Sequence, residues 1–423
     1  MIPTKITNII LPLITVILIF AMSLLIIAYG RGYRLDFRKK SVGTTGLIAV
    51  TSDPIGAQIF INGQKKEVTN TNLSINPGWY TVTIMKNGYQ SWEKYMRVQG
   101  EIVTRVDAML FSSNPSLYAL TTSGVIGPTL SPDGAKLAYL VPELEATMAS
   151  QITSRAGIWV LDLVDKPLGM NRDARQVLKA SQLNLTDAAL AWSPDSKQLL
   201  ITNPKNQAYL IEADKSNDFP KPVTDLSLLY SDWKDLIQAK EKEKLLPLKE
   251  EFLSVATTSM DIIAFSPDES RILYEATAAA TIPPVIIPAL PGTNPTEEVR
   301  DIVKGNIYVY DVKEDRNYFI DTKIIRQKDD KTKNISDASY SEAGLTVSPS
   351  LIQWLTTSRH LMIVEKDKVE VLDYDGTNKK TVYAGPFWNG FVAPWGNAGR
   401  IVILTNLNPS ASAVDNLYAV NIR

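Results

Sequence analysis

The sequence predicts a mainly β protein in three parts: an N-terminal transmembrane helix, a small β-sandwich, and a roughly five-bladed β-propeller with a helical-hairpin insertion. Three observations predict this organisation. Residues 1–40 contain a stretch of 25 residues without a charged side chain. Residues 41–112 contain short apolar runs that turn residues separate, and residues 113–423 contain a cassette that returns five times.

The uncharged stretch, residues 6–30, is dominated by isoleucine and leucine. At about 1.5 Å per residue, a helix of this length crosses a hydrocarbon core of about 30 Å. A cleaved signal peptide is the alternative, because Ala28-Tyr29-Gly30 is a small-x-small triplet. The apolar core of a signal peptide spans only about 7–15 residues, however. We therefore expect a retained single-pass anchor, with the lipid bilayer as partner of residues 6–30.

Basic residues follow this stretch, and only Asp36 opposes them: Arg31, Arg34, Arg38, Lys39 and Lys40. The positive-inside rule then places the C-terminal part in the cytoplasm. The alternative is that the cluster binds anionic headgroups on whichever face of the membrane it meets.

Residues 41–112 predict a separate unit of short strands, at 47–51, 58–61, 79–85, 90–98 and 103–110. Asn62-Gly63, Asn76-Pro77-Gly78 and Asn87-Gly88 are turn signals between them. The alternation of strand and turn over so short a stretch is typical of a small β-sandwich.

Three segments of this unit, residues 52–63, 77–82 and 86–89, resemble the PEGA domain in order and spacing. Ile55 stands where the name-giving motif has glutamate, and Thr69-Asn70-Thr71 where members often have a Gly-Thr-Thr-Pro turn. Neither change disturbs the strands. The resemblance implies a small sandwich that serves extracytoplasmic proteins as an adhesion or spacer module, without catalytic residues.

The cassette is an apolar strand, a tight polar turn, a second strand and, after a variable gap, a third strand. Its five copies begin at Thr129, Ala191, Ala264, Gln353 and Ala393. In Ser131-Pro132-Asp133-Gly134, proline presets the backbone, aspartate bonds back to the chain and glycine takes the left-handed conformation. The strands are nearly continuous apolar runs, so both faces of each sheet are covered. A propeller provides this cover, since each blade lies between two neighbours; unrelated hairpins in a sandwich are the alternative.

The last cassette ends at Arg423, just after its third strand. We expect residues 117–121 to supply its outer strand, because an uncovered edge could pair with other chains. The cassettes, together with residues 373–378 before the run 380–383, resemble the TolB-like branch of β-propellers, which is related to WD-repeat proteins. Asp375-Gly376 predicts a hairpin turn; a calcium loop is the alternative, but no glutamate closes it as in an EF-hand. The two resemblances favour an extracytoplasmic location over the cytoplasmic one that the charges indicate.

Insertions interrupt the cassettes. A helical hairpin is predicted at about 228–257, over blade two or three, from two apolar faces on either side of Pro247: Leu229, Trp233, Leu236 and Ile237, then Leu248, Phe252, Val255 and Ala256. A proline-rich loop at about 281–296 carries the apolar run Val285-Ile286-Ile287, a candidate partner contact whose alternative is packing on the blade. Residues 323–337 are polar and predict a flexible outer loop.

The sequence offers little chemistry. It has no cysteine, one histidine (His360, in the fourth cassette) and a net charge of −1. Gly-x-Ser-x-Gly, phosphate-binding and His-Glu-x-x-His motifs are absent from it. We therefore predict no catalytic residue, cofactor, metal or nucleic-acid partner, and expect His360 to be an ordinary strand or turn residue.

These observations predict a membrane-anchored, non-catalytic binding or scaffold protein of the cell envelope, with a protein, peptide or glycan partner held by the propeller. Trp388, Phe391 and Trp395 are candidate contacts, with core packing as their alternative. Two other functions stay open: a propeller enzyme with an acidic site in the central channel, and a regulatory sensor that acts on a membrane partner.

Overall fold

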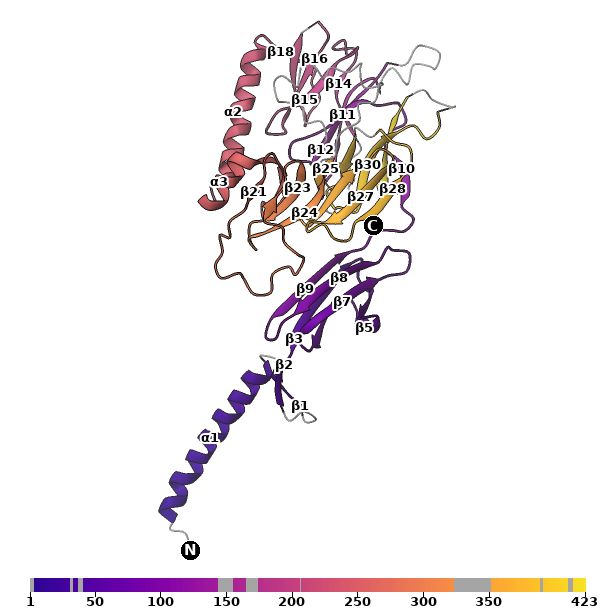
Figure 1. The fold of residues 1–423 in the computed structure, drawn as a ribbon. Helices are drawn as coiled ribbons and strands as arrows, with labels where there is room; N and C mark the ends of the chain where they lie inside the picture. The colour runs from indigo at the N-terminus through magenta and orange to yellow at the C-terminus, as the bar shows by residue number, and fades with distance from the viewer. Residues whose placement is uncertain are drawn as a thin grey trace. The chain divides into compact units, whose positions relative to one another are not determined.

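The computed structural model describes residues 4–30, 33–36, 41–143, 155–164, 174–205, 207–322, 351–388, 391–409 and 414–423 (Figure 1). The chain divides into two compact units. The first comprises residues 1–110 together with 288–297, and the second comprises residues 111–287 and 298–423. The flexible loop predicted at 323–337 lies outside the described residues.

The chain begins with helix α1 (Thr4–Gly30), and a short hairpin of β1 (Tyr33–Asp36) and β2 (Ser41–Thr44) follows it. Side chains of α1 are described for residues 13–27, where the large apolar ones are all exposed, by 51% to 66%. Within the described part of the chain, no helix has the length and apolar character that crossing a membrane requires. The anchor predicted through residues 6–30 stays a prediction.

The rest of the first unit is a sandwich of two sheets. The three-stranded sheet has the order β6-β3-β9, with β3 and β9 parallel, and the four-stranded sheet has the order β5-β4-β7-β8. The strands are β3 (Gly46–Asp53), β4 (Gln58–Ile61), β5 (Gln64–Val68), β6 (Thr71–Ile75), β7 (Gly78–Met85), β8 (Trp92–Val98) and β9 (Val103–Met109). Alternate apolar residues of these strands form the core, among them Ile48, Val50, Ile59, Val82, Ile84 and Met96. The five predicted strands are present; β5 and β6 were not predicted.

The second unit contains five four-stranded antiparallel sheets, the blades. Blade one is β11 (Ile126–Leu130), β12 (Lys136–Val141), β13 (Gly157–Asp162) and β14 (Arg175–Lys179), and blade two is β15 (Ala189–Trp192), β16 (Gln198–Thr202), β17 (Ala208–Glu212) and β18 (Lys221–Val223). Blade three is β19 (Met260–Phe265), β20 (Arg271–Ala276), β23 (Asn306–Asp311) and β24 (Arg316–Thr322), and blade four is β25 (Ile352–Trp354), β26 (His360–Val364), β27 (Lys368–Asp373) and β28 (Lys380–Ala384). Blade five is β29 (Val392–Pro394), β30 (Arg400–Thr405), β31 (Asn416–Asn421) and β10 (Ser116–Ala119). The short strands β21 (Ala280–Thr281) and β22 (Asp301–Ile302) form a hairpin within the insertion of blade three.

The blades follow one another around a circle. Apolar clusters join blade five to one, one to two, and three to four. Between blades four and five, the Gln353 amide donates to the carbonyl of Val392 at 3.1 Å. Strand β10 pairs with β31, Leu117 opposite Val420, so the start of the unit supplies the outer strand of the last blade. The predicted supply of an outer strand to the last blade is confirmed, and the sheets and the contacts between them support the predicted propeller.

The predicted helical hairpin is helices α2 (Leu226–Leu245) and α3 (Glu250–Ser259), which lie between blades two and three (Figure 1). Trp233 of α2 packs on Leu200 of blade two, and Phe252 of α3 stacks on Tyr310 of blade three with ring centroids 4.0 Å apart. The helices therefore cover one face of the second blade and one face of the third blade. Leu236 was wrongly assigned to the packed face. It is 51% exposed and is not part of the cluster in which Trp233, Leu229 and Ile237 pack.

The polar turns of the cassette hold neighbouring blades together. In each case a serine in the turn of the next blade, Ser196 or Ser358, accepts two hydrogen bonds. Its hydroxyl accepts one from a backbone amide of the preceding turn, and its carbonyl accepts one from a basic side chain. The distances are Asp133 N to Ser196 Oγ 3.2 Å, Lys136 Nζ to Ser196 O 3.2 Å, Asp268 N to Ser358 Oγ 3.0 Å, and Arg271 Nη1 to Ser358 O 2.9 Å. These contacts join blade one to two and blade three to four.

Replacing Ser358 by alanine is expected to lower the free energy of unfolding by about 1 kcal/mol, because the partly buried Asp268 N–H loses its acceptor. Urea unfolding followed by tryptophan fluorescence measures the change. Ser254→Ala removes a hydroxyl from the exposed surface of α3 and should change stability by less than about 0.5 kcal/mol. Equal effects of the two substitutions would mean that the Ser358 contact does not stabilise the interface.

Candidate functional site

An exposed aromatic pair stands on the outer face of the four-stranded sheet of the sandwich. Trp79 of β7 is 49% exposed and Tyr95 of β8 is 61% exposed. Their rings are stacked, with centroids 5.0 Å apart and an angle of 16° between the planes. Successive side chains of a strand point to opposite faces, so the burial of Val82 and Ile84 in the core directs Trp79 outward.

The register between β7 and β8 places a cation beside this pair. Trp79 lies directly opposite Arg97, and Thr81 lies opposite Tyr95. Tyr95 therefore reaches the indole diagonally, a cross-strand distance that aromatic side chains can span. The stack holds the indole of Trp79 in one orientation, because Tyr95 supports one of its faces.

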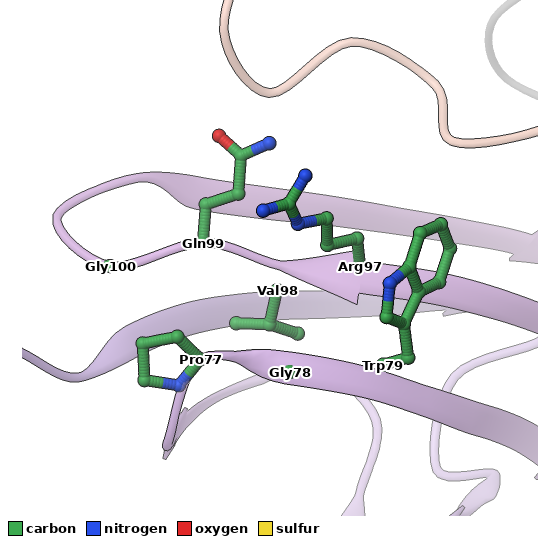
Figure 2. Close-up of a pocket in the computed structure, with 7 residues that line it drawn as sticks. All are labelled: Pro77, Gly78, Trp79, Arg97, Val98, Gln99 and Gly100. Carbon is green, nitrogen blue, oxygen red and sulfur yellow. The ribbon is translucent and has the colours of Figure 1, made fainter.

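A hollow of about 620 Å³ borders Trp79 on the side of the Asn76-Pro77-Gly78 turn. Figure 2 shows the side chains of Trp79, Arg97 and Gln99 directed to the same side of the β7–β8 pair. Arg97 is the only ionisable residue among those that line the hollow, which are Pro77, Gly78, Trp79, Arg97, Val98, Gln99 and Gly100. The volume lies within the range of about 300–1,000 Å³ that is typical of small-molecule sites.

The arrangement suits binding. The hollow offers a flat aromatic wall, a guanidinium and a side-chain amide, without a nucleophile or a carboxylate. Among the described residues, no group of three or more histidine, cysteine, aspartate or glutamate side chains could hold a metal ion.

The predicted aromatic contacts are instead core residues of the propeller. Phe391 and Trp395 are buried in the cluster between blades five and one, and Trp388 packs against the same cluster. The alternative of core packing therefore describes all three. Trp192 and Trp354 stand one cassette position before Trp395, and their indoles donate to the preceding blade, to Thr129 O at 3.0 Å and to Ala264 O at 3.4 Å.

The apolar run of the proline-rich loop divides into packed and exposed residues. Val285 packs against the core of blade three, and Ile286 is partly buried, whereas Ile287 is 80% exposed. The backbone amides of Val285 and Ile286 donate to Asp315 Oδ2 at 2.7 and 2.9 Å. A buried carboxylate thus fixes the start of the loop, and of the three predicted contacts Ile287 is the one that faces solvent.

The alternative function, an enzyme with an acidic site in the central channel, concerns the first strand of each blade. Along β11, β15, β19, β25 and β29, one carboxylate is present, that of Asp261.

His360 forms a polar contact within blade four. Its Nδ1 lies 2.8 Å from Thr357 Oγ1 and its Nε2 lies 3.3 Å from Asp373 Oδ1, while Phe111 meets the ring edge-on. Arg271 and Asp311 occupy the same cassette positions in blade three, where they form an ion pair. His360 is therefore a strand residue that pairs two strands of a blade, as the sequence predicts.

Comparison with known proteins bears on the sandwich first. The family model of the PEGA domain matches residues 45–114, the range that contains β3 to β9. This sandwich is similar to the PEGA domain. The predicted resemblance is thereby confirmed, and the hollow beside Trp79 lies within the PEGA-like sandwich. No curated protein matches the chain.

Two solved structures are similar to the chain as a whole. The crystal structure of TolB from Acinetobacter baumannii is 14% identical with a TM-score of 0.21; the match covers 81% of this chain and 59% of TolB. An oligogalacturonate lyase in complex with manganese is 10% identical with a TM-score of 0.22; the match covers 84% of this chain and 81% of the lyase. TM-scores this low do not establish the fold. The propeller follows instead from the five sheets and the contacts between blades described above.

Sequence reasoning placed the candidate contacts on the propeller and did not single out the aromatic face of the PEGA-like sandwich. A signal was present in the strands. Trp79, Tyr95 and Arg97 occupy positions that alternate with core residues, where short polar side chains are usual in a half-exposed strand.

Proposed function

We propose that the protein is a non-catalytic binding protein of the cell envelope, tethered to a bilayer by α1, that captures its ligand on the outer face of the PEGA-like sandwich. The observation that carries this proposal is the exposed stack of Trp79 and Tyr95 beside Arg97. Tryptophan, tyrosine and arginine dominate the energetics of binding surfaces. Rings that their own contacts hold rigid lose little conformational entropy when a ligand binds.

The tether is supported by the character of α1. Its described side chains, residues 13–27, are apolar on every side and exposed. A helix that is apolar all round requires an apolar environment, which a bilayer supplies. The location outside the cytoplasm is supported by the similarity to the PEGA domain, because that resemblance implies a module of extracytoplasmic proteins.

The tether and its orientation are tested together in intact cells. The full chain is expected in the membrane fraction after extraction with alkaline carbonate, and protease added to spheroplasts is expected to degrade the propeller. Release by carbonate would contradict the tether. Full protection from protease would place the propeller in the cytoplasm.

The binding face is tested with a photoreactive side chain in the full-length protein. Tyr95 is replaced by p-benzoylphenylalanine, and Phe219, a 94% exposed aromatic residue of blade two, is replaced in the same way as the matched control. Illumination of living cells should yield a cross-linked envelope component from position 95 and not from position 219. Equal yields, or none at position 95, would contradict a binding role for this face.

A further inference from the structure

We infer that the hollow beside Trp79 binds a carboxylated glycan, with a sugar ring on the indole and a carboxylate on Arg97; this inference rests on the proposed binding function. The charge of the hollow supplies the first step. Arg97 is its one ionisable lining residue and forms no ion pair with any described residue. A guanidinium presents donors in a planar fork that matches a carboxylate, so the hollow selects an anion.

The indole of Trp79 supplies the second step. Tyr95 stacks on the indole and is not among the residues that line the hollow, so Trp79 borders the hollow with a part of its ring system that Tyr95 leaves uncovered. A sugar ring has a C–H face that can lie on an apolar aromatic surface and a rim of hydroxyl groups. The amide of Gln99, which rises beside Arg97, can bond to that rim (Figure 2).

The backbone of the site argues for a glycan over a peptide. A peptide that binds as an added strand is held by main-chain N–H and C=O groups at an open sheet edge of its receptor. Here Gly78 pairs with Val98 and Trp79 with Arg97, so these lining residues face one another in the ladder between β7 and β8. Recognition through side chains alone fits a ligand whose polar groups are hydroxyls and carboxylates.

The test uses the full-length protein in lipid nanodiscs and isothermal titration calorimetry. Three probes are compared: an oligosaccharide of six uronic-acid rings, its neutral methyl ester, and hexaglutamate. The uronate is expected to bind at least tenfold more tightly than its ester, and hexaglutamate not to bind. Arg97→Ala should bring the uronate to the affinity of the ester, whereas Trp79→Ala should weaken both sugars at least tenfold.

Two controls match these substitutions elsewhere in the chain. Arg105→Ala removes an arginine that is 72% exposed on β9, and Phe219→Ala removes an exposed aromatic ring from the propeller. Both variants should bind as the wild type does. Circular dichroism confirms that each variant is folded; Trp79 and Arg97 are exposed, so their loss leaves the core of the sandwich intact.

Each contrary result overturns a definite part of the inference. Equal affinity for uronate and ester would refute the selection of an anion, and tight binding of hexaglutamate would refute the glycan class. If no sugar binds while the cross-link at position 95 persists, the ligand class is wrong and the proposed binding function stands. If the cross-link is also absent, the proposed function itself fails.

Discussion

Raising the pH from 10 to 11 is expected to unfold the propeller. Burial raises the pKa of five of its tyrosines above the ordinary value of about 10: Tyr139, Tyr274, Tyr310, Tyr318 and Tyr374. Below that value the tyrosines are protonated in both states and their contribution to stability is complete. Above it they ionise in the unfolded state but not in the folded one, so stability falls as the pH rises.

The size of this effect decides the outcome. The unfolded tyrosine is only half ionised at pH 10, so each such tyrosine removes about 1 kcal/mol between pH 10 and 11 and five remove about 5 kcal/mol, comparable with the total stability of about 5–15 kcal/mol of a typical protein. Absorbance at 295 nm reports tyrosinate, and circular dichroism reports the strands. The two signals should change together in one steep transition. A gradual rise of tyrosinate near pH 10 with unchanged circular dichroism would contradict the expectation.

Tyr318→Phe provides the control for the alkaline transition. Burial raises the pKa of Tyr318, and its hydroxyl has no hydrogen-bond partner among the described residues, so its loss should leave stability at pH 7 unchanged or slightly higher. The alkaline slope should fall by about 1.4 kcal/mol per pH unit. Tyr310→Phe differs, because the hydroxyl of Tyr310 donates to Asp315 Oδ1 at 2.8 Å and its loss should already destabilise the protein at pH 7.

The strands of the propeller could be predicted because their sequence pattern occurs in five copies. A single apolar run followed by a polar turn does not identify its secondary structure. Five copies at similar spacing indicate that each copy forms the same kind of sheet. The missing outer strand could also be predicted, since β10 closes the edge that β31 would expose. The place of the helical hairpin could not. The faces of α2 and α3 indicate that they pack, but two different blades provide their partners.

A polar pair within each blade was also missed. By register, the first residue of the second strand lies opposite the last residue of the third strand: Lys136 and Asp162, Gln198 and Glu212, Arg271 and Asp311, His360 and Asp373, Arg400 and Asn421. The variable gap between the two strands hides their register, so the sequence does not show that each third strand ends opposite a basic or amide side chain.

The proposed binding face was harder to predict than the fold. Alternation along β7 and β8 indicates which side chains leave the core, but it does not distinguish a solvated aromatic from a binding one. The distinction needs the diagonal stack of Trp79 on Tyr95, and the hollow between the turns that end at Gly78 and Gly100. Both depend on how far β7 and β8 extend before they turn, which turn signals fix only approximately.

Replacing Asp311 by alanine is expected to destabilise the propeller by about 3–5 kcal/mol, the usual cost of removing one partner of a buried ion pair. Asp311 is fully buried, and its Oδ2 lies 2.8 Å from Nε of Arg271, which is 13% exposed. The two atoms are not aligned for a hydrogen bond, so the attraction is chiefly electrostatic. The variant leaves the guanidinium with the carbonyl of Ser358 and the ring of Tyr374, neither of which carries a compensating charge. Urea unfolding at pH 7 measures the loss.

The repeat itself supplies the matched control for Asp311. Glu212 holds the same position in blade two, but its partner Gln198 is uncharged, so Glu212→Ala leaves no isolated charge and should cost about 1 kcal/mol. If the unpaired cation causes the loss, Asp311→Ala combined with Arg271→Met should recover much of it, because the double variant buries no charge. A double variant as unstable as Asp311→Ala would show that the loss comes from contacts other than the ion pair. These are the packing of Arg271 on Tyr374, at 3.9 Å, and the backbone amides of Lys313 and Glu314, which donate to Asp311 Oδ1 at 3.0 Å.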